Sequence, residues 1–165
     1  MTVRWPLQEL AQLTDVELNA FRLEPKQRVS QTRQKQKGVH YEQNYDLLAS
    51  SDESRRYRLF VRHSSVHPEV FSAGLILLLP RSEDLILCRY NGGGHTHNNY
   101  LERERLPAKP HVHFTTERYL QRGLYAEAYA TLTPDYHSID GALHCLVRDC
   151  NISGITTIPD QLRLL

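Results

Sequence analysis

The chain has 165 residues and a formal net charge of +1 at pH 7; apolar residues make up 40% of it and charged residues 24%. This length and apolar content predict one domain over residues 1–165, and the balanced charge by itself predicts no strongly basic or acidic partner. The three cysteines form no C-x-x-C pair, which argues against a disulfide framework or a cysteine zinc knuckle. We therefore expect a protein of the reducing cytoplasm.

Two features argue against contact with a membrane. Residues 1–13 have neither a long apolar core nor a small-residue cleavage site, so they do not resemble a signal peptide. The longest apolar run, residues 74–80, is far too short to cross a bilayer and is typical of a buried strand. No membrane partner is expected.

The first predicted element is a short helix that begins after Thr14. Glu17 completes a capping box, and Pro25 limits the helix to about three turns. Residues 26–38 follow and are polar and basic, with five cations and no acid. We interpret them as an exposed basic arm, with contact to nucleic acid or to an acidic partner as the sharper alternative. The candidate contacts in this arm are Lys26, Arg28 and Arg33.

The middle of the chain has the period of β-strands. Apolar and charged residues alternate over residues 57–64. Two apolar runs, residues 70–80 and 84–92, flank a short polar connection and predict an antiparallel hairpin. Residues 111–116 follow Pro110 and predict a further short strand.

The last third is predicted to be helical. Residues 118–132 contain good helix formers interrupted by Gly123, and residues 138–152 form a clearer amphipathic helix that Ser138 can cap. The order of helix, antiparallel strands and helix predicts an α+β fold. In this fold a central antiparallel sheet is flanked by N- and C-terminal helices.

Four histidines form two His-x-His pairs, His95/His97 and His111/His113. Residues i and i+2 of a strand point to the same side, so His111 and His113 share one face while Val112 takes the other. We expect Val112 to pack in the core and the histidines to face a cleft or water. The connection between the pairs contains charges and prolines, and we interpret it as a loop that turns the second pair toward the first.

A basic residue and a run of glycines precede the first histidine pair. Glycines permit positive φ and allow a ligand to approach the main-chain N–H groups closely. A phosphate suits such a turn, and Arg89 at the end of the preceding strand can pair with it. The candidate phosphate-binding residues of this turn are Asn91, Gly92, Gly93 and Gly94.

Three interpretations of the histidines stay open at this point. In the first, two imidazoles act as base and acid on an RNA phosphodiester while Arg89 stabilises the phosphorane, without a metal. In the second, the histidines bind a divalent transition metal, in a spacing that resembles the first metal motif of cupins but lacks its preceding glycine and a second motif. The metal ligands would then be His95, His97, Glu102, His111 and His113. In the third, the histidines have no ligand.

Four short motifs, "LTDVEL", "RYNGGGHTH", "PHVHF" and "CLVRDCNI", together resemble a known family. Residues 84–152 resemble the core of the TumE family, toxins of prokaryotic toxin–antitoxin systems, and a related uncharacterised bacterial and phage domain. The resemblance implies a small cytoplasmic toxin-like protein with a neighbouring antitoxin and RNA-directed chemistry. The triple glycine and the basic arm depart from the family pattern. Carried over by position, the resemblance points to Arg89, Asn91, His95, His97, His111 and His113.

The residues and the resemblance together favour a toxin-like hydrolase, a metal-independent endoribonuclease without a cofactor. His111 and His113 provide base and acid, and Tyr100 or Tyr119 stacks on a base of the RNA. RNA and a cognate antitoxin are the expected partners, and a homodimer is a further expected assembly. The alternatives are a cupin-like metal protein and a nucleic-acid-binding accessory protein without catalysis. The catalytic set in this hypothesis is His111, His113, His95, His97 and Arg89.

Overall fold

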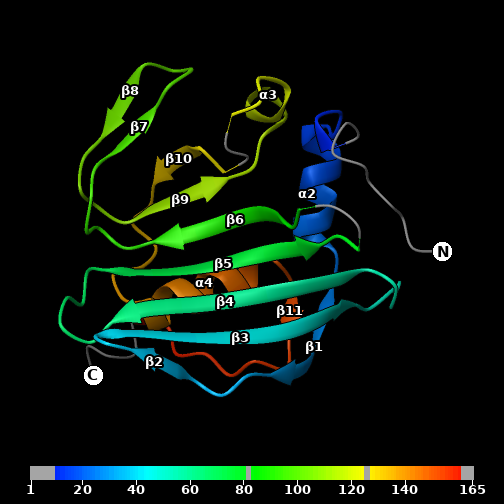
Figure 1. The fold of residues 1–165 in the computed structure, drawn as a ribbon, viewed down its shortest axis with the longest axis horizontal. Helices are drawn as coiled ribbons and strands as arrows, with labels where there is room; N and C mark the ends of the chain where they lie inside the picture. Colours follow the sequence, from blue (N-terminus) through cyan, green and yellow to red (C-terminus); the bar gives the residue numbers. More distant parts are fainter. Residues whose placement is uncertain (1–9, 81–82, 125–126, 161–165) are drawn as a thin grey trace.

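A computed structural model describes residues 10–80, 83–124 and 127–160 of the chain (Figure 1). Within these ranges nine strands form one sheet, in which all neighbours are antiparallel except one parallel pair, and the α+β prediction is confirmed. The sheet contains β10-β9-β6-β5-β4-β3-β1-β11 in this order, and β2 pairs with β3 beside β1. The strands are β1 (Lys26–Gln31), β2 (Lys35–Lys37), β3 (His40–Ala49), β4 (Arg56–Ser64), β5 (Phe71–Leu78), β6 (Leu85–Asn91), β9 (His111–Phe114), β10 (Tyr129–Leu132) and β11 (Ile152–Ser153).

The predicted central hairpin is present. The antiparallel pair β5 and β6 meets in a register that opposes Ser72 to Asn91 and Gly74 to Arg89. A Cβ at Gly74 would lie 2.3 Å from the ring of Phe60 on β4, so only glycine lets this ring lie across β5. The predicted strand at residues 111–116 is β9, which pairs with both β6 and β10.

Two of the helices begin where the sequence predicts. α2 (Asp15–Leu23) has the full capping box of Thr14 and Glu17, and α4 (Ile139–Asp149) begins at Ser138, whose side chain accepts a hydrogen bond from the N–H of Gly141. The helix predicted over residues 118–132 is wrong as a single element. It divides into α3 (Glu117–Gln121) and strand β10, because Gly123 has a left-handed φ of +64° after α3.

Residues 26–38, which the sequence predicts to be an exposed basic arm, contain two strands of the main sheet. β1 lies between β3 and β11, and β2 extends the same edge of β3. The partner strand β3 has no counterpart among the predicted elements. These polar segments are strands because their backbone groups pair with neighbouring strands, while most of their side chains stay exposed.

The connection predicted as a loop between the histidine pairs contains a second, two-stranded sheet. β7 (His97–Asn99) and β8 (Glu104–Leu106) form this hairpin, which projects beyond β9 and β10 at one corner of the molecule (Figure 1). Asn99 is 1% exposed, and its amide exchanges two hydrogen bonds, of 2.8 and 2.9 Å, with the backbone of Ala130 on β10. This contact ties the turn end of β7, two residues after His97, to the main sheet.

The core lies between one face of the sheet and α4, which runs behind β4 and β5 (Figure 1). Tyr57, Leu75 and Leu87 from the strands pack there with Leu146 of the helix, and all four are fully buried. The opposite face of β4, β5 and β6 bears polar side chains that include Arg62, Ser72 and Asn91. Of the described helices, none has the length and apolar content needed to span a membrane.

Candidate metal centre

The candidate site lies on the sheet face that points away from α4. Tyr90 of β6 donates a hydrogen bond of 2.6 Å to Asp149 in the last turn of α4, so its neighbours Arg89 and Asn91 point to the opposite face. The register places Arg89 directly opposite His113 of β9, and Asn91 opposite His111. The same strand alternation therefore brings the basic residue and the second histidine pair together.

The two histidine pairs meet, as the sequence predicts. The ring centroids of His95 and His111 are 5.0 Å apart, and those of His97 and His113 are 4.6 Å apart. Within the second pair the centroids of His111 and His113 lie 5.0 Å apart. The four imidazoles therefore form one cluster at the end of β6 and β9.

The second pair is buried, whereas the sequence predicts that it faces a cleft or water. His111 is 0% exposed and His113 is 3% exposed. The Nδ1 atom of His111 lies 2.8 Å from the carbonyl oxygen of Lys109, and that of His113 lies 2.8 Å from the carbonyl oxygen of Glu127. A carbonyl oxygen only accepts hydrogen bonds, so Nδ1 holds the proton in each ring and Nε2 presents a lone pair.

Both Nε2 atoms are buried and have no hydrogen-bond partner among the described residues. Burial, together with the nearby charge of Arg89, lowers the pKa of His113 to about 3. Burial likewise lowers the pKa values of His111 and His95. These imidazoles are therefore neutral at pH 7, which is the protonation state that a metal ligand requires.

Three of the histidines form a donor set for a metal ion. One nitrogen from each of His95, His111 and His113 lies within 4.8 Å of the other two. Three nitrogens around a tetrahedral ion at 2.0–2.1 Å are about 3.4 Å apart, so the rings must approach by roughly 1 Å. His95 is exposed and adjoins the glycine turn, and its side chain can make this movement.

Two of the five predicted metal ligands are engaged elsewhere. His97 places Nε2 2.7 Å from the carbonyl oxygen of Ala128. Glu102 accepts a hydrogen bond of 2.6 Å from the hydroxyl of Tyr119 and forms an ion pair with Arg118. Neither belongs to the three-histidine set, so the cupin-like spacing of His95, His97 and Glu102 does not describe the centre.

Arg89 is half-buried beside this cluster. Burial is the main cause that lowers the pKa of its guanidinium, while Glu127 raises it and Arg62 lowers it. Its Nε atom has no hydrogen-bond partner in the described part of the chain, and no carboxylate there lies within ion-pair distance of it. The prediction that Arg89 adjoins the histidines is confirmed.

The glycine turn has a packing role that the sequence did not reveal. The N–H of Gly92 donates to the carbonyl of Phe71 at 3.0 Å, and a Cβ at Gly92 would lie 2.2 Å from the carbonyl oxygen of Glu69. A Cβ at Gly93 would lie 3.1 Å from Lys109. These glycines allow three backbone segments to pass closely, and the N–H of Gly92 is not free for a phosphate.

Of the other residues predicted to contact RNA, two are buried and three are exposed. Lys26 and Tyr119 are both 0% exposed, so the predicted roles of Lys26 as an RNA contact and Tyr119 as a stacking platform do not fit the fold. Tyr100 is 71% exposed in the connection between β7 and β8. Arg28 and Arg33 are exposed, and neither belongs to the pocket described next.

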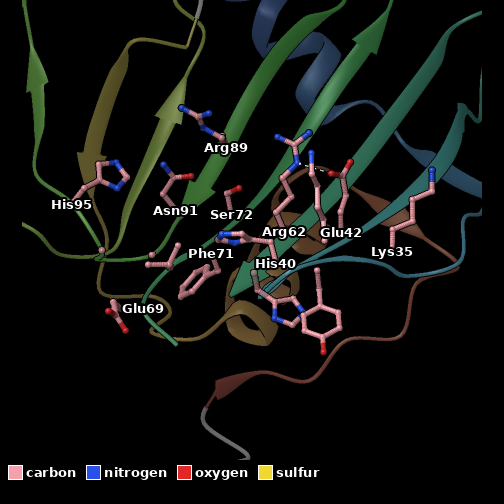
Figure 2. A pocket seen from close by; sticks show the side chains of 16 residues that line it. Lys35, His40, Glu42, Arg62, Glu69, Phe71, Ser72, Arg89, Asn91 and His95 are labelled. Atoms are coloured by element: carbon pink, nitrogen blue, oxygen red, sulfur yellow. Dashed lines mark ion pairs between the residues drawn. The ribbon is translucent and has the colours of Figure 1, made fainter. Parts of the chain in front are cut away.

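A pocket of about 640 Å³ adjoins the histidines across five strands (Figure 2). Figure 2 shows the head groups of Arg89, Asn91 and Arg62 on the same side of the sheet. Arg62 did not enter the predicted site, although its alternation with apolar residues in β4 placed it on this face. The cationic and hydrogen-bonding residues that line the pocket include Lys35, Lys37, His40, Arg62, Ser72, Arg89, Asn91 and His95.

The chain was compared with protein-family models, with curated proteins and with solved structures, and no match was found in any of the three.

Proposed function

We propose that this protein binds a divalent transition metal through His95, His111 and His113. Neutral imidazole suits zinc, copper, iron and nickel. Three protein ligands leave a coordination position for water or a substrate, as in the zinc sites of enzymes. The function proposed is therefore that of a metal protein whose centre is open to the adjoining pocket.

The orphaned nitrogens of His111 and His113 support this proposal most directly. A buried polar atom without a partner is costly, and both Nε2 atoms lie in the same cluster. The backbone carbonyls of Lys109 and Glu127 hold the opposite ring nitrogens. Metal-binding histidines are oriented in this way, with the second N–H donated to a carbonyl or carboxylate.

The first experiment is a titration of the metal-free full chain with Zn²⁺ followed by calorimetry. We expect one equivalent to bind, and we expect His113→Ala to weaken binding by more than about 100-fold, the upper range for loss of an outer-shell partner. His95→Ala should give a similar loss without opening a cavity, because His95 is exposed. His67→Ala is the matched control, since this exposed imidazole lies outside the centre.

Stoichiometric binding that survives in both the His113→Ala and His95→Ala variants would contradict the proposed centre. Circular dichroism of each variant separates loss of the ligand from loss of the fold. Absence of Zn²⁺, Ni²⁺ and Cu²⁺ binding in the wild-type protein would contradict the proposal as a whole.

The second candidate function is cleavage of RNA without a metal by a toxin-like protein, which the TumE resemblance suggests. The position of Arg89 opposite His113 favours it, because a cation beside an imidazole suits phosphodiester chemistry. The low pKa of His113 keeps its imidazole neutral at pH 7, so it could act only as a weak base and not as a proton donor. RNA cleavage by chelator-treated protein that is abolished by His113→Ala would favour this function over the metal centre.

A further inference from the structure

The pocket beside the histidine centre has the size and the wall of a ligand site. Its volume of about 640 Å³ falls in the range of roughly 300–1,000 Å³ that small-molecule pockets occupy. It extends from His95, at the metal centre, across β6, β5 and β4 to Lys35 on β2 (Figure 2). A ligand held there would therefore reach the centre with one end.

The charges of the pocket favour an anion. Glu42 pairs with Arg62 at 3.4 Å, which offsets one of the cations. Lys35, Lys37 and Arg89 have no carboxylate within ion-pair distance among the residues described. Glu69 also lines the pocket, but its head group points away from this row of side chains in Figure 2 and lies 3.7 Å from His67.

Arg89 indicates the kind of anion. A guanidinium that is half-buried without a carboxylate is costly, and an anionic ligand removes that cost. The planar fork of arginine matches a phosphate bidentately. Lys35 and Lys37 lie on β2 at the far side of the pocket, and their charges add to the attraction of an anion.

Asn91 indicates what the phosphate is attached to. Its side chain is 5% exposed, lines the pocket, and has an amide oxygen with no hydrogen-bond partner among the described residues. An amide both accepts and donates, so it complements a hydroxyl group, which does the same. Ser72 lies opposite Asn91 in the register and adds a second hydroxyl-binding group to the wall.

We propose that this pocket binds a sugar phosphate ester, with Arg89 on the phosphate, Asn91 and Ser72 on sugar hydroxyls, and the two lysines adding positive charge at the far end of the pocket. Binding itself is independent of the metal. Only the position of the ester beside a metal ion rests on the proposed function. Free nucleotides and the ribose phosphates of an RNA strand share this chemistry.

The experiment titrates the metal-free full chain with adenosine 5′-monophosphate, with ribose 5-phosphate and with a five-nucleotide single-stranded RNA. We expect binding of all three, weakened about ten- to hundredfold by Arg89→Ala, as for loss of a charge-assisted hydrogen bond. Lys35→Ala, which changes an exposed residue, should weaken binding by a smaller factor. Arg56→Ala is the matched control, because Arg56 is exposed at the opposite end of β4 from Arg62.

The three probes distinguish the source of the ligand. Equal affinity for the nucleotide and the RNA would support a free metabolite, and RNA binding at least tenfold tighter would support a strand. Absence of binding by all three, or binding unchanged in both Arg89→Ala and Lys35→Ala, would overturn the inference. The Zn²⁺ titration of the same wild-type preparation reports the proposed function separately, so failure of the pocket and failure of the metal centre are told apart.

Discussion

Lys26 is a charged residue with no exposed surface. Its ammonium group donates to the backbone carbonyls of Arg22, Glu24 and Cys150 at 2.9, 2.8 and 3.2 Å. It also lies 4.7 Å from the ring centroid of Tyr57, so a cation–π contact adds to the three hydrogen bonds. These contacts join α2, β1, β4 and the end of α4 at one point.

Burial lowers the pKa of Lys26 from 10.5 to about 8, opposed by the nearby Cys150 and Glu24. Between pH 8 and 10.5 the unfolded chain keeps a proton that the folded protein has released. Unfolding then takes up a proton, so this group makes the free energy of unfolding rise with pH, by up to about 3 kcal/mol. We expect Lys26→Met to lack this rise in urea unfolding measured from pH 7.5 to 10.5.

The comparison isolates Lys26, because Glu24, Arg55, Tyr57, Cys88 and Cys150 also face it and are present in both proteins. Lys37→Met, at an exposed position of β2, is the control and should keep the wild-type profile. Parallel pH profiles for the wild type and Lys26→Met would show that burial does not perturb this lysine.

The N-terminus of α4 depends on a residue far along the chain. The carboxylate of Asp160 accepts hydrogen bonds from the N–H groups of His137 and Ser138, at 2.7 and 3.2 Å, and from the hydroxyl of Ser138. That hydroxyl oxygen in turn accepts from the N–H of Gly141 at 3.1 Å. The segment after the helix therefore satisfies backbone donors at its start.

Ser138→Ala removes this cap and should lower the free energy of unfolding by about 1–2 kcal/mol, as is typical for loss of a serine N-cap. Urea unfolding at pH 7 measures the change. Ser51→Ala, in the exposed connection between β3 and β4, is the control and should have little effect. A Ser138→Ala variant as stable as the control would mean that Asp160 alone caps the helix.

The hydrophobic core and the candidate site lie on opposite faces of one sheet. α4 and the apolar side chains occupy one face, and the histidine centre and the pocket occupy the other (Figures 1 and 2). A metal at the centre would link His95 in the glycine turn to His111 and His113 on β9. Because the unfolded chain holds no such arrangement, binding would stabilise the folded protein.

Zn²⁺ at about 100 times its dissociation constant should therefore stabilise the protein by about 2.7 kcal/mol and raise its Tm by about 5–10 °C. Differential scanning calorimetry with and without the ion measures this shift. Mg²⁺ prefers oxygen ligands and should leave Tm unchanged. An equal shift in the His113→Ala variant would locate the effect elsewhere in the chain.

Elements with a strong local period or a local cap can be predicted from the sequence alone. The α+β class, both capped helices, the β5–β6 hairpin and the strand β9 could all be predicted in this way. The proximity of the histidine pairs and of Arg89 could also be predicted, because strand alternation and a short connection determine it. RNA as substrate and an antitoxin as partner stay predictions.

Which polar residues are buried, and what their atoms contact, depends on long-range packing that local sequence does not specify. Lys26 looked like part of an exposed arm, yet β1 becomes a strand through pairing with β3 and β11, and three carbonyls receive its ammonium group. The predicted histidine pairs do lie together, but His111 and His113 are buried and do not face a cleft or water. The fold brings a backbone carbonyl to Nδ1 of His111 and another to Nδ1 of His113, and this leaves each Nε2 without a proton. Local sequence does not specify such long-range burial and hydrogen bonding.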